Sequence, residues 1–237
     1  AFPRGGNGGG GNGGGRGGGG GRGGAPAPLD PAQIAYLKTL YAPPPIRPFP
    51  ADNPATPEKL ALGKQLFFET GLSGNDQIAC ATCHDARHGF ADPQPLSIGV
   101  KGAPLARRTQ PVVNLAWQTR FFWDGRADTA EAQAVMPIAN EDEMGMPHAL
   151  MAQRLRADPA YRRQFAKAFP GEAIGPATVG KALAVFERSL VATDTAFDKW
   201  LAGDEGAISE EAKRGFVEFN TRAGCSQCHA GWNFSDG

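Results

Sequence analysis

All four cysteines of this 237-residue chain lie in two copies of one five-residue pattern. The copies are Cys80-Ala-Thr-Cys83-His84 and Cys225-Ser-Gln-Cys228-His229. In C-x-x-C-H, the two thiols are spaced to form thioether bonds with the vinyl groups of a haem, and the adjacent imidazole is placed to bind its iron. One accidental copy is expected about 10⁻³ times in a chain of this composition. The pattern therefore predicts two covalently bound c-type haems and redox chemistry.

Two other chemistries use paired cysteines, and the spacing here disfavours both. Zinc ribbons usually bring two C-x-x-C pairs within about 15–20 residues of each other, whereas 142 positions separate Cys83 from Cys225 (225 − 83). Disulfides or a thioredoxin-like dithiol leave both following histidines unexplained. We therefore expect the haem-binding residues to be Cys80, Cys83, Cys225 and Cys228, with His84 and His229 as the iron ligands.

Bulk composition excludes several classes of function. The 24 basic residues balance the 24 acidic ones, so no global field favours nucleic acid or a membrane surface. No apolar run approaches the roughly 20 residues that span a bilayer. Bacteria attach haem covalently outside the cytoplasmic membrane, so we predict a periplasmic location. A removed signal peptide and an incomplete N-terminus both fit a chain that begins at Ala1.

Composition divides the chain into four segments. Residues 1–28 are rich in Gly and Arg and offer little apolar surface to bury, so they are predicted to form a disordered tail; nothing downstream supports RNA binding by this tail. Residues 29–56 are predicted to form a Pro-rich, extended strap. Segments 57–193 and 194–237 carry one haem motif each, which predicts two cytochrome c-like haem domains. Only eight residues follow His229, so we expect the second domain to be incomplete.

The haem-bearing segments are predicted to be helical. In 176–191 the apolar residues are spaced as on one helix face, namely Val179, Leu183, Phe186 and Leu190. Segment 58–68 follows Pro57, a favoured first-turn residue, and is expected to bury Leu60, Leu62, Leu66 and Phe67. Further helices are predicted at 78–88 and 209–219. No alternating segment indicates a strand, so the predicted fold class is all-α.

Several motifs resemble the bacterial dihaem cytochrome c peroxidase family, which includes the MauG-type enzymes. The matching stretches are LGKQLFF at 62–68, FWDGR at 122–126, FDKW at 197–200 and CHAG at 228–231. The resemblance covers roughly residues 57–237. It implies a peroxidatic first haem and an electron-entry second haem. The implied activity is reduction of hydrogen peroxide to water, with electrons from a small cytochrome c or cupredoxin.

The resemblance also assigns residues around the first haem. The family has Gln, Pro and Glu ten, fourteen and twenty positions after its tryptophan, which from Trp123 gives Gln133, Pro137 and Glu143. These imply an acid–base carboxylate in Glu143, a hydrogen-bonding amide in Gln133 and a pocket wall in Pro137, while Trp123 couples the two haems. One carboxylate can move a proton between the two peroxide oxygens, contributing about 10²–10⁴-fold. The alternatives are a solvated acid at 143 and an ordinary core tryptophan at 123.

The sequence departs from the family at two positions. Many family peroxidases carry a second histidine sixteen residues after the proximal one, but residue 100 is valine, which cannot bind iron. We therefore expect His84 to be the only protein ligand of the first haem. The family also binds calcium partly through an asparagine, where this chain has Arg108. A cation is a poor neighbour for calcium, which disfavours that site.

Three functions fit the motifs. The first is a dihaem peroxidase; the second is a MauG-type enzyme that uses peroxide to oxidise side chains of a partner protein. The third is an electron-carrier cytochrome without peroxidase activity, which Gln133, Pro137 and Glu143 disfavour. In the family the distal ligand of the second haem, Met or Tyr, separates the first two, and it falls beyond Gly237. Met144 and Met146 belong to the first-haem side. We place the peroxidase first.

Overall fold

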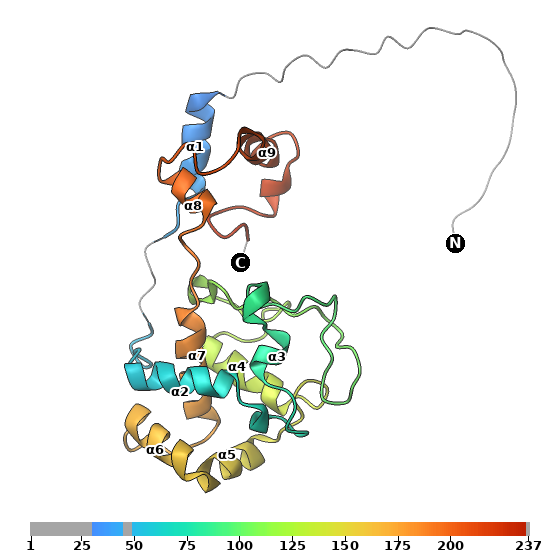
Figure 1. Cartoon of the computed structure of the whole chain (residues 1–237), viewed down its shortest axis with the longest axis vertical. Coiled ribbons are helices and arrows are strands. Elements are labelled where there is room, and N and C mark those ends of the chain that lie inside the picture. The colour runs from blue at the N-terminus through green and yellow to red at the C-terminus, as the bar shows by residue number, and fades with distance from the viewer. Residues whose placement is uncertain (1–29, 45–48, 236–237) are drawn as a thin grey trace, which may run out of the picture.

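The computed structural model describes residues 30–44 and 49–235, and the tail predicted for 1–28 lies outside them. The described residues are helical and contain only isolated β-bridges, which confirms the predicted all-α class (Figure 1). The helices are α1 Pro31–Tyr41, α2 Pro57–Phe67, α3 Cys80–Cys83, α4 Ala130–Ala139, α5 His148–Ala157, α6 Pro159–Ala168, α7 Pro176–Ser189, α8 Ala196–Leu201 and α9 Glu210–Asn220. Single 3₁₀ turns are η1 Thr70–Leu72, η2 Ala86–His88, η3 Leu115–Trp117 and η4 Cys225–Gln227. None of the described helices has both the length and the apolar character needed to cross a membrane.

Helix α7 is the central element of the larger unit and packs against α2 and α4. The predicted apolar face of α7 is confirmed, since Val179, Leu183 and Phe186 are buried. Phe67 of α2 meets Phe186 with ring centroids 5.2 Å apart. The prediction for Leu60 is wrong, because its side chain is 39% exposed. Leu60 lies on nearly the same side of α2 as Phe67, but about two turns earlier, so its exposure reflects its position at the start of the helix.

A close backbone contact between α2 and α7 depends on Gly63. A Cβ atom at this position would lie 2.0 Å from the carbonyl oxygen of Ala182 on α7, and that backbone atom cannot move independently of its helix. Gly63→Ala is therefore expected to lower the free energy of unfolding by about 1–3 kcal/mol. Chemical denaturation followed by circular dichroism measures the change.

Gly215 on α9 provides the matched control. It is also helical, but a Cβ atom there would meet nothing within 4 Å. Gly215→Ala should therefore stabilise its helix by about 0.5–1 kcal/mol through helix propensity alone. Equal gains from both substitutions would contradict the proposed close packing at Gly63.

The strap predicted for 29–56 is wrong over residues 31–41, which form α1. Asp30 caps this helix by accepting a hydrogen bond from Ala32 N, and Pro31 occupies its first turn. Asp before Pro is a helix-start signal that the composition of the segment obscured. Helix α1 packs with α8 and α9 (Figure 1). The buried residues of this smaller cluster are Leu37, Tyr41, Trp200 and Phe216.

The C-terminal segment also contacts the larger unit. The rings of Trp117 in η3 and Trp232 meet edge to face, with centroids 4.6 Å apart. Asn114 donates a hydrogen bond to Asn233 Oδ1 (3.4 Å) and accepts one from Ala192 N (2.8 Å). These contacts place the residues that follow the second haem motif against the loop that precedes Trp123.

Candidate functional site

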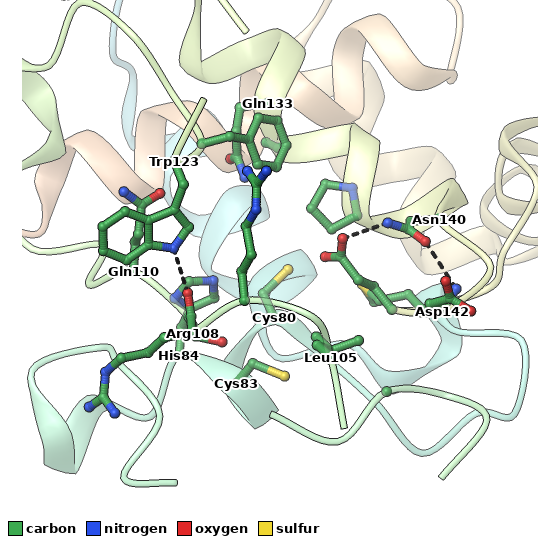
Figure 2. A pocket seen from close by; sticks show the side chains of 18 of the residues that line it. Cys80, Cys83, His84, Leu105, Arg108, Gln110, Trp123, Gln133, Asn140 and Asp142 are labelled. Carbon is green, nitrogen blue, oxygen red and sulfur yellow. Dashed lines mark hydrogen bonds between the residues drawn. The ribbon is translucent and has the colours of Figure 1, made fainter. Parts of the chain in front are cut away.

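A cavity of about 380 Å³ lies between α3, α4, α7 and the loops that connect them (Figure 2). We call it the haem cavity. Its volume falls within the range of about 300–1,000 Å³ that is typical of cofactor sites. Seven residues singled out from the sequence line it: Cys80, Cys83, His84, Trp123, Gln133, Pro137 and Glu143. The fold thus brings the first haem motif and the predicted peroxide-binding residues around one space.

The first haem motif is held on one helical turn. The backbone N–H of His84 donates to the carbonyl of Cys80 (2.9 Å), which places both thiols and the imidazole at the cavity wall. His84 Nδ1 lies 3.1 Å from the carbonyl oxygen of Phe90. This contact orients the ring with Nδ1 as donor and leaves Nε2 for a metal ion, as second-shell hydrogen bonds commonly do. Burial lowers the pKa of His84, which favours the neutral, metal-binding form.

The second haem motif repeats this local geometry. His229 N donates to Cys225 O (2.9 Å), and His229 Nδ1 lies 3.2 Å from the carbonyl oxygen of Phe234. Cys225 and Cys228 are exposed, and all four cysteines are free thiols. Within 30–44 and 49–235, no cluster of three or more His, Cys, Asp or Glu residues could hold a metal ion. The two motifs therefore share one local arrangement, in which the histidine closes a turn with the first cysteine and its Nδ1 faces a backbone carbonyl.

Helix α4 supplies one wall of the haem cavity. Thr129 caps its first turn by accepting a hydrogen bond from Ala132 N (3.1 Å). Gln133 and Pro137 are four residues apart, which places them on the same face of the helix, and both line the cavity. Proline has no N–H to donate to the carbonyl of Gln133, so one main-chain hydrogen bond of the helix is missing beside the cavity. The helix ends two residues later, at Ala139.

The turn after α4 positions Glu143. Asn140 donates from Nδ2 to Glu143 Oε1 (2.7 Å) and accepts from Asp142 N (3.0 Å); Figure 2 shows the bond between Asn140 and Asp142. The carbonyl of Glu143 accepts from Val100 N (2.8 Å). Burial raises the pKa of Glu143, although the hydrogen bond from Asn140 acts in the opposite direction. Sequence reasoning missed Asn140, which holds one carboxylate oxygen in place.

Val100 holds the backbone of Glu143 through a hydrogen bond. Its side chain packs against the main hydrophobic core. Among the described residues that line the haem cavity, His84 is the only histidine. The position expected to lack an iron ligand thus has a backbone role in the site.

Trp123 is not a core tryptophan, because its side chain is 60% exposed. Its indole N–H donates to the backbone carbonyl of Arg108 (2.7 Å; Figure 2), and part of its ring lines the cavity. Trp117, which sequence reasoning missed, is the tryptophan that contacts the segment after the second haem motif. The guanidinium of Arg108 lies 3.4 Å from two backbone carbonyls, those of Asp92 and Gln94.

A second carboxyl group that the sequence did not reveal faces the haem cavity. Glu187 of α7 lines it, is 6% exposed, and its Oε2 has no hydrogen-bond partner among the described residues. A buried polar atom without a partner is rare in folded proteins. Together with the imidazole of His84 and two free thiols, this atom indicates that the cavity is built to enclose a further group. The residues present therefore fit a c-type haem.

Comparisons with known proteins agree with this geometry. Residues 57–206 match the model of the family described as "Di-haem cytochrome c peroxidase". The methylamine utilization protein MauG of Methylorubrum extorquens is 50% identical over 204 residues, covering 86% of this chain and 58% of that protein. The cytochrome c551 peroxidase of Nitrosomonas europaea is 36% identical over 187 residues, covering 79% of this chain and 56% of that protein. The chain spans just over half the length of these relatives.

Solved structures share the fold. A MauG-like protein associated with microbial copper homeostasis superposes with a TM-score of 0.71 at 36% identity, covering 80% of this chain and 56% of that one. The diheme peroxidase BthA of Burkholderia thailandensis has a TM-score of 0.67 at 22% identity, covering 78% and 50%. The family match covers more than half of the chain, and the site carries the residues that the motifs imply. The chain therefore belongs to the di-haem cytochrome c peroxidase family.

Proposed function

We propose that this protein is a dihaem peroxidase that reduces hydrogen peroxide to water. The observation that carries the proposal is the placement of Glu143, Gln133 and Pro137 around the same cavity as the first C-x-x-C-H motif. An electron carrier has no need of an oriented carboxylate beside its haem. A small periplasmic redox protein, either a cytochrome c or a cupredoxin, would supply the electrons, and the protein would act in the periplasm.

The residues of the two motifs would hold the haems. Cys80 and Cys83 would form thioethers to the first, with His84 Nε2 as its iron ligand. Cys225, Cys228 and His229 would hold the second in the same way. When bound, the haems supply redox-active iron. We propose residues 57–193 and 194–237 as the first and second haem domains, with α1 packed on the second.

Glu143 would move the proton during peroxide cleavage. Its carboxylate takes a proton from one peroxide oxygen and returns it to the other, which makes water the leaving group. Asn140 keeps Oε1 fixed, so Oε2 is the oxygen left to exchange the proton. The Gln133 amide donates a hydrogen bond without competing for that proton. Trp123 would carry electrons between the haems.

Peroxide-driven oxidation of a reduced small cytochrome c by the haem-loaded protein tests this function. Fast multiple turnover, with return to the resting haem spectrum, supports the peroxidase. Absence of both peroxide consumption and any spectral change on adding peroxide would leave only the electron-carrier alternative.

A MauG-type role is the second candidate, favoured by the 50% identity to a methylamine utilization protein MauG. That enzyme class would use the same proton chemistry but withdraw electrons from side chains of a partner protein. A long-lived oxidised haem spectrum with negligible cytochrome oxidation would favour this role over the peroxidase. The same stopped-flow experiment separates the two outcomes.

The absence of a histidine at position 100 predicts an open first-haem site in the resting protein. With His84 as the only histidine at the described cavity wall, we expect a high-spin ferric haem without prior reduction. Electron paramagnetic resonance of the as-isolated ferric protein measures this directly. A spectrum with low-spin signals only would mean that another side chain, such as the cavity-lining Met144, binds the first iron.

A further inference from the structure

Glu187 is buried at the wall of the haem cavity without a partner for one of its oxygens. Its side chain is 6% exposed, and Oε2 makes no hydrogen bond with any described residue. An ionised carboxylate in such surroundings carries a large desolvation cost. Either a paired cation or a bound proton can offset this cost, and the neighbouring charges decide which of the two applies to Glu187.

The nearest cation in the sequence does not neutralise Glu187. Arg188 binds Glu131 of α4 through two hydrogen bonds, Nη1 to Oε1 (2.5 Å) and Nη2 to Oε2 (2.8 Å). This fork-shaped pairing occupies the guanidinium. Glu131 itself adds negative charge near Glu187, which further disfavours a second carboxylate.

Three arginines line the same cavity as Glu187, but each is held elsewhere. Arg107 and Arg126 pair with Asp124, and Arg108 lies against the backbone carbonyls of Asp92 and Gln94.

The elements packed around α7 bring no further cation to Glu187. From α3, the thiol of Cys80 lines the same cavity; burial raises its pKa, and the charge of Glu187 raises it further. Of the charged residues on α2, Lys59 binds Asn53 and Pro54, while Glu58 and Lys64 are exposed. Element η3 contributes no ionisable residue. A proton is therefore the remaining way to neutralise Glu187.

We propose that Glu187 is a proton-holding residue of the haem cavity, which takes up one proton from solvent when the first haem is reduced and releases it on oxidation. With the haem bound, reduction by a one-electron donor would remove one positive charge from the cavity. A carboxyl beside that charge then holds its proton more tightly. Glu187 lies near Cys80, one of the two thioether positions, and so near the edge of the proposed haem. The inference rests on haem loading into this cavity.

The acidity of Glu187 suits this exchange. Burial raises its pKa to about 7, with Arg188 acting to lower it and Glu131 to raise it. Both the neutral and the ionised forms are therefore accessible near neutral pH. Glu187 differs in this respect from Glu143, which is held by Asn140 for proton transfer to the substrate. The cavity would thus have two carboxyl groups with separate tasks.

A redox titration of the haem-loaded protein against pH tests the proposal. At a fixed ambient potential, the ratio of ferrous to ferric first haem in the wild type should fall up to tenfold per pH unit in a window above about pH 7. Glu187→Gln should remove this dependence, because the amide keeps the shape but binds no proton. Glu143→Gln is the matched control and should retain it. A dependence that persists in Glu187→Gln, or disappears in Glu143→Gln, would overturn the assignment.

A second measurement covers the case in which Glu187→Gln fails to load haem. Redox-difference infrared spectroscopy of the Glu143→Gln protein should show a gain of protonated carboxyl on reduction, with a carbonyl band that shifts in D₂O. No such band would overturn the proposal. Haem content and peroxide turnover are measured separately, so a loaded protein that shows the pH dependence without turning over peroxide would reject the proposed function and leave this inference standing.

Discussion

Glu143→Gln is expected to lose about 10²–10⁴-fold in peroxide turnover while keeping both haems. Glutamine preserves the shape of the side chain and can still bind Asn140, but it cannot accept the proton that hydrogen peroxide must release. Steady-state oxidation of a reduced cytochrome c measures the loss, and haem absorbance confirms loading. The reduction of the protein by its electron donor should be unchanged, because it does not involve this proton.

Glu141 provides a matched control for this substitution. It lies two positions before Glu143 in the same acidic turn, but its side chain is 89% exposed and pairs loosely with Lys101. Glu141→Gln should therefore leave turnover within about twofold, since exposed ion pairs contribute little. Similar turnover losses in the two variants would assign the effect to the charge of the turn and remove Glu143 from the mechanism.

Glu187→Gln is expected to stabilise the protein at alkaline pH. The pKa of Glu187 is about 7 in the folded state and 4.5 in the unfolded chain, so the folded protein binds more protons between these values. The free energy of unfolding therefore falls as the pH rises from about 4.5 to 7, and it does not fall further on this account well above pH 7. The difference corresponds to about 3 kcal/mol. We expect the variant to gain up to this amount above about pH 8 and almost nothing below about pH 4.

Denaturant unfolding at several pH values measures this gain, and Glu131→Gln gives the opposite control. Burial acts to raise the pKa of Glu131, but hydrogen bonds from Arg188 and Asn53 hold it below the ordinary value. Removing that carboxylate should therefore lower stability at neutral pH, an effect that fades in acid. A Glu187→Gln protein that is no more stable at alkaline pH would show that Glu187 finds a partner in the loaded protein.

The site residues that belong to short local motifs could be predicted from the sequence. Both haem motifs and the spacing from Trp123 to Glu143 are local in sequence, and the fold gathers the residues around the first motif into one cavity. The helix at 176–191 was also predictable, because its core face follows the helical period. The exposure of Leu60 was not, since the period places it on nearly the same side of α2 as Phe67, and only the extent of the neighbouring elements leaves the first turn uncovered.

The residues that were missed depend on tertiary neighbours. Asn140 has a role only because the turn after α4 folds back toward its own carboxylate. Glu187 follows Phe186 directly and would be solvated on a helix with a narrow apolar face, but α2, α4 and the cavity wall surround α7 on several sides. Helix α1 was hidden because proline-rich composition dominated the segment, although Asp30 and Pro31 form a local start signal.

The position of α1 has a consequence for the order in which the protein can be assembled. Its partners lie near the opposite end of the sequence, since Lys38 bonds Trp200 across 162 positions and Tyr41 bonds Asn220 across 179. Contacts this distant form late, because a long loop must close first. During synthesis, the first haem motif can therefore be enclosed while the apolar side of α1 is still exposed, because α8 and α9 have not yet packed against it. We expect the first haem to be attached before the second, and α1 to be the segment most in need of protection from misassociation in the nascent chain.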